Sequence, residues 1–205
     1  TNMFRGFENA GDKEGLIFVI LGKDDPGIIT WVPDILNRAK KTGMALLNDN
    51  SLIDLSNEKM PEGKNLLKPI NEEEIKTFDN YTESEFKAFI SRYNERLISE
   101  FKLDNGFVCA QIIGNNFQNK INEPAIKHNT GFNLNILKAK KGVIEKLNFK
   151  KPTVMFSQKG NWQITIDNKK ITLGSKDTIS IPTNINISIE IDESFEGQLN
   201  CVSQV

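Results

Sequence analysis

The chain has 205 residues and carries 26 Lys and Arg against 27 Asp and Glu, which gives a formal net charge of −1. The sequence contains no basic block, which argues against nucleic-acid binding because neutralising phosphates requires a clustered positive surface. No apolar run approaches the roughly 20 residues of a membrane-spanning helix. We therefore expect a globular protein of one or two domains that binds neither nucleic acid nor membrane.

The two cysteines, Cys109 and Cys201, both lie in apolar stretches with the character of strands. Neither belongs to a Cys-x-x-Cys pair or to a cluster with histidine, which a metal or redox site would require. We interpret both as buried thiols without a disulfide, and we expect a cytoplasmic protein.

Residues 1–30 have the pattern of strands. The run GLIFVILG, residues 15–22, is apolar throughout and bounded by glycines, which predicts a buried strand. The period then changes in WVPDILNRAKKTG, where Pro33 suits a first helical turn and Gly43 suits the end of the helix. We expect residues 51–69 to be irregular, because Pro and Gly punctuate them.

Residues 71–103 carry the clearest helical signals. Asn71 with Glu74, and Thr82 with Glu85, have the spacing of capping boxes. After the second cap, apolar residues recur at helical spacing, which predicts an amphipathic helix packed on a sheet. These residues are Phe86, Phe89, Ile90, Tyr93, Leu97, Ile98 and Phe101. A helix that binds a partner protein is the alternative.

From residue 106 onward the pattern is that of short strands separated by turn residues. Many segments alternate, as in NWQITID, where Trp162, Ile164 and Ile166 face one way. About nine short strands at this spacing predict a sandwich or closed barrel, because closure removes exposed sheet edges. Among them we expect four separate strands in GFNLNILKA, VIEKLNF, INISIEI and GQLNCVSQV. The expected fold class is mainly β with a helical insert.

The run KPTVMFSQKGNWQITIDNKKITLGSKDTISIPTNINISIEI, residues 151–191, resembles the core of a cupin, a small jelly-roll barrel. The shared order is a hydrophobic strand, the turn Lys159-Gly160, a second strand, Leu173 before a Lys-Asp turn, and a strand that ends at Pro182. The resemblance extends over residues 107–205 and implies a cupin-type double-stranded β-helix preceded by connector helices.

The segment RGFENAGDKEGLIFVILGKDDPGIITWVPDIL, residues 5–36, resembles the tail of a different cupin domain, and Asn9 matches the Asn that ends the second cupin metal motif. The resemblance therefore implies the C-terminal part of a two-cupin (bicupin) protein. Residues 1–30 would be the terminal strands of a partial first cupin, residues 31–105 a helical connector, and residues 106–205 a C-terminal cupin barrel.

Catalytic cupins hold a metal through two His and a Glu of a first motif and one His of a second, a donor set that leaves positions open for substrate. In this chain the resemblance aligns other residues with those positions. They are Leu147 and Phe149 for the paired His (or Asn148 and Lys150 in a register shifted by one), Thr153 for the Glu and Ile187 for the last His. The metal motifs are degenerate, and we expect neither a metal nor another cofactor in this barrel.

Arg5 aligns with the metal-binding His of the first cupin's second motif. Arginine is always protonated and cannot act as an ordinary ligand. We expect it either to close the barrel mouth through a hydrogen bond or ion pair, or to recognise a substrate carboxylate. The one histidine, His128, has no motif for a nucleophile beside it, and we expect it at a surface or interface.

Two hypotheses of different classes follow. In the first, the barrel has no metal, contains no catalytic residue and serves as a small-molecule-binding or structural, oligomerising barrel, with its interior filled by its own side chains. Its candidate ligand contacts are Arg5, Phe149, Lys150, Thr153, Gln158, Trp162 and Ile187. In the second, the chain is a portion of a metal-dependent bicupin enzyme of the dioxygenase, lyase or isomerase type, whose metal site lies in an N-terminal cupin upstream. We favour the first, and we expect a homodimer joined through β edges.

Overall fold

The computed structural model describes residues 7–20, 30–78, 80–92, 100–114, 123–126 and 131–204. The chain divides into two compact units, Thr1–Tyr81 and Thr82–Val205, and each is described by itself. Among the helices in the described ranges, none has the length and apolar character needed to cross a bilayer.

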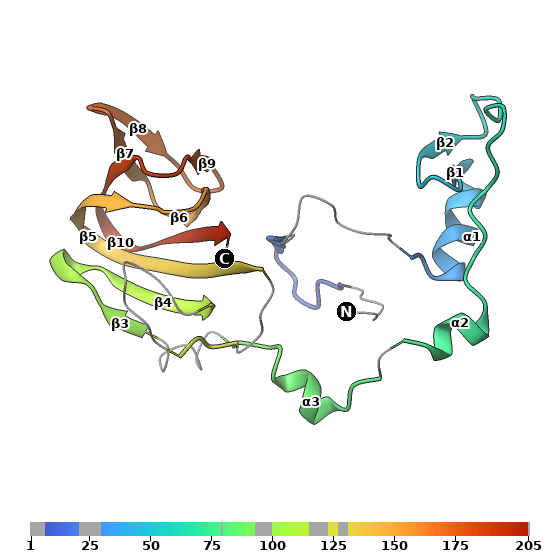
Figure 1. Ribbon diagram of the computed structural model, residues 1–205, viewed down its shortest axis with the longest axis horizontal. Coiled ribbons are helices and arrows are strands. Elements are labelled where there is room, and N and C mark those ends of the chain that lie inside the picture. The colour runs from blue at the N-terminus through green and yellow to red at the C-terminus, as the bar shows by residue number, and fades with distance from the viewer. Residues whose placement is uncertain are drawn as a thin grey trace. The chain divides into compact units, whose positions relative to one another are not determined.

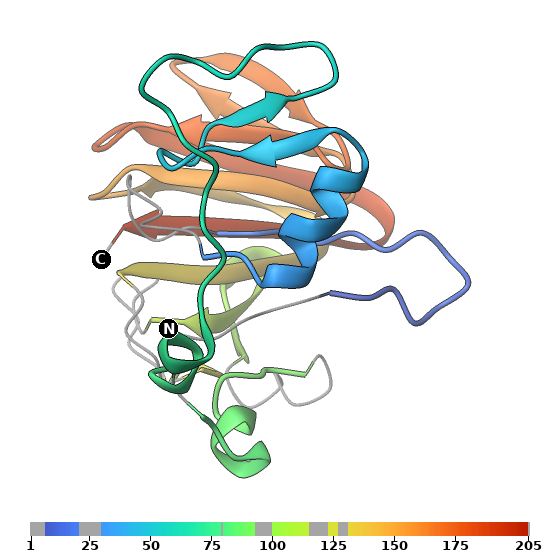
Figure 2. The ribbon, with the colours of Figure 1, turned by 90° about the vertical axis from the view of Figure 1, so that its right-hand side faces the viewer.

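In the N-terminal unit, a helix leads into a two-stranded hairpin (Figure 2). The helix α1 (Pro33–Lys41) has Pro33 in its first turn, and Gly43 follows its end with φ 83°, so both signals in the sequence are confirmed. The strands β1 (Met44–Leu46) and β2 (Leu52–Asp54) pair antiparallel. The prediction that residues 51–69 are irregular is therefore wrong for β2.

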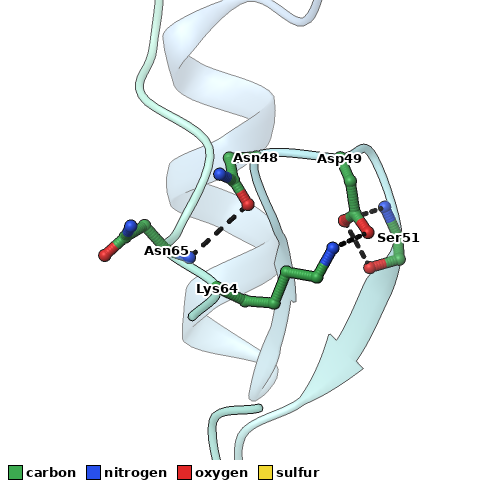
Figure 3. A network of polar contacts seen from close by, with 5 residues as sticks. All are labelled: Asn48, Asp49, Ser51, Lys64 and Asn65. Carbon is green, nitrogen blue, oxygen red and sulfur yellow. Dashed lines mark hydrogen bonds and ion pairs between the residues drawn. The ribbon is translucent and has the colours of Figure 1, made fainter. Parts of the chain in front are cut away.

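A small core and a polar network hold this unit together. The core cluster consists of the buried residues Ala45, Leu47 and Ile53, with Leu66 packed against them, and Leu36 of α1 is also buried. The Asp49 carboxylate accepts hydrogen bonds from the backbone N of Ser51 at 3.2 Å and from its hydroxyl at 2.7 Å (Figure 3). Its other oxygen lies 2.7 Å from Lys64 Nζ. The bond from Lys64, followed by those from Ser51, holds the pKa of Asp49 well below its usual range.

Residues 7–20 contain no helix or strand, and Leu16, Ile17 and Val19 are 58%, 57% and 65% exposed. The prediction of a buried strand over residues 15–22 is therefore wrong for the described residues 15–20, while residues 21 and 22 lie outside the described ranges. An apolar run becomes a buried strand only when a neighbouring strand satisfies its backbone and covers its side chains.

The described part of residues 71–103 contains two short helices, and the amphipathic helix predicted to follow the second cap ends with the second of them. Both capping boxes form, at the start of α2 (Glu72–Lys76) and of α3 (Glu83–Lys87). Neither helix has a buried residue, and the next described element is the strand β3 (Glu100–Lys102). The prediction is therefore wrong where the structure describes residues 88–92 and 100–103, and residues 93–99 lie outside. Caps fix where a helix starts, but packing of an apolar face is what extends it.

The C-terminal unit is an antiparallel sandwich, and two long strands belong to both of its layers (Figure 1). After β3, its elements in chain order are the 3-10 turn η2 (Asp104–Gly106), β4 (Val108–Ile113), β5 (Phe132–Asn148), β6 (Thr153–Lys159), β7 (Trp162–Ile166), β8 (Lys169–Leu173), β9 (Thr178–Ile181) and β10 (Asn186–Gln204). The expected mainly β class, a jelly-roll sandwich with small helical inserts, is confirmed.

The strand order defines the two layers. The first layer runs β3-β4-β5-β10-β6-β9 and uses residues 132–139 of β5 and residues 197–204 of β10. The second layer uses the other halves of the same two strands, residues 141–148 and 186–192, followed by β7 and β8. The sequence predicted each long strand as two separate strands, because a bend within a strand and a turn between strands both interrupt the alternation.

Each long strand changes layers beside a glycine. Gly142 of β5 has φ 157°, and a Cβ there would lie 2.0 Å from the carbonyl oxygen of Asn105. Gly197 of β10 follows a register shift that begins at Asp192. A Cβ at Gly197 would lie 2.4 Å from Ile191 Cδ1 and 3.0 Å from an indole carbon of Trp162. Both bends therefore require a residue without a side chain.

The main core lies between the two layers. Its fully buried members include Trp162, Met155, Ile164, Ile181, Ile187, Ile189, Ile191 and Leu199. Outside the first layer, Lys138 of β5 forms an ion pair with Glu100 of β3, and the two side chains are only 8% and 16% exposed. Because breaking a buried pair leaves one charge uncompensated, this contact fixes β3 to the sheet.

Replacing Gly197 by Ala tests the crossing of β10. We expect Gly197→Ala to lower the free energy of unfolding of the C-terminal unit by about 1–3 kcal/mol, because the new methyl overpacks the contact between Ile191 and Trp162. Urea denaturation followed by circular dichroism measures the change. Gly174→Ala is the matched control, since its Cβ would meet only side-chain atoms, the Asp177 carboxylate at 3.2 Å and Asn161 Oδ1 at 3.6 Å. Equal losses in the two variants would contradict this account of the bend.

The Asp49 network makes a prediction about titration. In an NMR titration, the Asp49 carboxyl should have a midpoint below the ordinary value of 3.8, and Lys64→Met should move the midpoint up towards that value. Because the folded-state pKa is depressed, the network stabilises the unit above the unfolded-state pKa and loses this effect as pH falls through the folded-state pKa. An unchanged midpoint in Lys64→Met would show that Lys64 is not the main cause.

Candidate functional site

The two ends of the sandwich interior are built differently. At the end beside the β6–β7 turn, Trp162 is fully buried, its Nε1 donates to the carbonyl of Lys159 at 3.1 Å, and its ring centroid lies 6.2 Å from that of Phe107. The opposite end lies beside the β5–β6 and β9–β10 connections, residues 149–152 and 182–185, and is called the loop end. There the backbone N of Asn184 donates to the carbonyl of Phe149 at 2.9 Å and ties the two connections together.

At the loop end, the second layer presents an apolar wall. Leu147 of β5 and Ile187 of β10 are ladder partners, and each is 2% exposed. Phe149 and Ile185 are partly buried and pack against the core beside them. The register shifts between Ile187 and Ile189, so β5 carries one extra residue there. This bulge lets Ile144 and Leu147 both face inward, although they are three residues apart.

The first layer presents a polar wall at the same end. Because side chains alternate along a strand, Gln111 faces inward with the core residue Cys109, and Asn135 faces inward with Leu137. Gln111 and Asn135 are ladder partners and are 0% and 3% exposed. Among the described residues, Asn135 Oδ1 has no hydrogen-bond partner. Leaving a buried amide oxygen unsatisfied costs about 1–3 kcal/mol, so this feature requires an explanation.

Two further inward residues continue this wall, on β10 and β6. Cys201 is the ladder partner of Asn135 on β10. Thr153 of β6 is fully buried, and its hydroxyl donates to the carbonyl of Lys151 at 3.1 Å. Burial raises the pKa of the Cys201 thiol to about 12, so the thiol is neutral near pH 7. Cys109 and Cys201 are both buried and form no disulfide, which confirms the interpretation from sequence.

The structure brings together only some of the residues that the sequence proposed as ligand contacts. Phe149, Thr153 and Ile187 all lie at the loop end. Lys150 is exposed in the β5–β6 connection. Gln158 is exposed on the outer face of the first layer, where Asn200 Nδ2 donates to its Oε1 at 3.5 Å.

The other candidates lie elsewhere or cannot be placed. Trp162 lies at the opposite end of the core, and Arg5 and His128 lie outside the described residues. Sequence reasoning missed Gln111 and Asn135. The alternation in FVCAQIIG and GFNLNILKA could have identified them, because each is a polar residue at a position where the alternation points a side chain inward.

The donors at the loop end do not fit a metal of the cupin type. Such a site needs imidazole and carboxylate groups that converge on one point. The aligned positions hold Leu147, Phe149 and Ile187, which have no donor atom, and Thr153, whose hydroxyl faces a backbone carbonyl. In the shifted register, Asn148 Nδ2 donates to Asn186 Oδ1 at 3.1 Å, and Lys150 is exposed. Nowhere in the described ranges do three or more His, Cys, Asp or Glu gather as potential ligands.

Comparison with solved structures finds cupin-superfamily proteins among the neighbours. An RmlC-like cupin from Shewanella frigidimarina has 10% identity and a TM-score of 0.43, over 56% of this chain and 87% of its own. A Cupin 2 conserved barrel domain protein from Salinispora arenicola has 12% identity and a TM-score of 0.41, over 51% and 80%. A cupin superfamily protein from Desulfitobacterium hafniense has 12% identity and a TM-score of 0.38, over 51% and 83%.

No protein-family model matches the chain, and no curated protein matches it. The neighbours have low identity and TM-scores below 0.5.

Proposed function

We propose that the C-terminal unit is a cupin-type barrel without a metal centre, which acts as a small-molecule-binding or structural module and not as a catalyst. The observation that carries this proposal is the burial of Leu147, Thr153 and Ile187, all 0–2% exposed in the interior; these are the residues that the sequence resemblance aligns with the motif ligands. A buried apolar side chain at a ligand position both removes the donor and fills the space of the ion.

The strand order supports an assembly role for the same unit. Among the described strands, β8 pairs only with β7, and β9 pairs only with β6. Each therefore has one edge of backbone donors and acceptors available for another strand. Lysines 169 and 170 lie on β8, whereas β9 carries no charged residue. We propose a homodimer joined through β edges, with β9 as the better candidate.

A second candidate function is part of a metal-dependent bicupin enzyme. Its support is the resemblance of residues 5–36 to the end of a second cupin metal motif, in which Asn9 holds the terminal position. In that case the metal would bind an upstream cupin, and the present barrel would be its scaffold. A coding sequence with a His-x-His and Glu motif upstream of residue 1 would favour this candidate over the first.

Metal analysis tests the proposed absence of a metal centre. We expect the purified chain, incubated with Fe, Mn, Ni or Zn and then desalted, to retain far less than one equivalent by mass spectrometry of the metals. The reason is that hydroxyl and aliphatic side chains cannot replace imidazole and carboxylate as ligands. Stoichiometric metal that survives desalting would overturn the proposal.

Light scattering after gel filtration tests the proposed dimer. We expect a mass near twice the chain mass of 23.2 kDa at micromolar concentration, with dissociation on dilution. A species of 23.2 kDa that does not change with concentration would contradict pairing through β edges.

A further inference from the structure

The loop end of the interior has two unlike walls, and nothing in the metal motif accounts for the polar one. The amides of Gln111 and Asn135 lie on β4 and on the first half of β5, outside the segments that carry the aligned ligand positions. Across the sandwich, the second layer presents Leu147 and Ile187 at the same end. A core packed only for stability would not leave Asn135 Oδ1 without a partner among the described residues, because a buried amide oxygen is costly unless it is hydrogen-bonded.

We propose that this polar wall is a binding site for a small uncharged molecule that carries an amide-like donor and acceptor group and a short apolar portion. Asn135 is 3% exposed, and its Oδ1 has no partner among the described residues. This oxygen would accept a hydrogen bond from the ligand. The wall of Leu147 and Ile187 would cover the apolar portion. This inference deepens the proposed function, on which it rests, by naming the class of ligand.

The electrostatics of the site select against charged ligands. The buried side chains of the first-layer wall are the amides of Gln111 and Asn135, the hydroxyl of Thr153 and the thiol of Cys201, and none carries a charge. Lys138, the one buried charged residue of this strand pair, lies on the opposite face, where it is paired with Glu100. An ion on the inner side would therefore lose its hydration without gaining a counter-charge.

In the proposed site, a ligand would enter from the loop end. Two positions beyond Asn135 and Cys201, towards that end, Asn133 and Ser203 are ladder partners on the same face. Both are partly exposed, whereas Gln111, Asn135 and Cys201 are buried. Hydrogen-bonding groups therefore continue from the partly exposed rim to the buried amides, and a polar ligand would find a partner at each step inward.

Acetamide is the probe, and acetate is its matched charged analogue of the same shape. We expect acetamide to shift the side-chain NH₂ resonances of Gln111 and Asn135 in ¹⁵N-correlated NMR spectra of the full chain. The response should saturate with a dissociation constant in the millimolar range, as a ligand of four heavy atoms allows. Acetate at the same concentrations should leave these resonances unchanged.

Two variants locate the site. Asn135→Leu should keep the fold, because an apolar residue of similar size replaces an unsatisfied amide, and should weaken the acetamide response of Gln111 at least tenfold. Gln158→Leu, on the outer face of the same layer, should leave it unchanged. If Asn135→Leu does not fold, the smaller substitution Asn135→Ala provides the second test, since it also removes the amide oxygen that would accept from acetamide, and binding should fall by a similar factor.

Each contrary result is distinguishable. The absence of a saturable shift with acetamide would overturn the proposed site. The same holds if a long-lived bound water is found at Asn135 instead. Equal responses to acetamide and acetate would overturn the charge selectivity, and an unchanged response in Asn135→Leu would overturn the assignment to this wall. Stoichiometric metal would overturn the proposed function without altering these readouts, so the two failures cannot be confused.

Discussion

The pairing of β5 with β10 is the constraint on which the rest of the C-terminal unit depends. These strands run antiparallel through both layers, and every other described strand of the unit pairs with one of them or with a neighbour that does. Since both strands bend beside a glycine, at Gly142 and Gly197, the two halves of each strand contribute to opposite walls of one core. The bends therefore decide which side chains face one another across the interior.

The chemistry of the interior follows from this geometry. Folding β5 over brings Asn135, from its first half, to the wall opposite Leu147, from its second half. β10 does the same with Cys201 and Ile187. The result is a neutral polar wall facing an apolar one, in a place where a cupin-type metal site would need imidazole and carboxylate. Opposite halves of β5 and β10 therefore contribute to both walls, and β4 and β6 complete the polar one.

The N-terminal unit has a much smaller core than the C-terminal unit. Its buried cluster has three residues with one more packed against it. Polar contacts, such as those of Asp49 with Ser51 and Lys64, therefore have a larger share in holding its loops in place. The apolar residues Leu16, Ile17 and Val19 remain exposed, although their sequence is more strand-like than that of β1 or β2. Strand formation here is decided by available partners and not by propensity.

The sequence by itself determined the features that depend on short-range chemistry. These include α1 with Pro33 and Gly43, both capping boxes, the buried thiols and the alternation that identifies the C-terminal unit as mainly β. Each of them rests on residues at most a few positions apart, so local rules suffice. The joining of four expected strands into β5 and β10, and the meeting of Gln111 with Asn135, were decided only by the tertiary structure. They depend on pairings between residues tens of positions apart, whose partners no local pattern specifies.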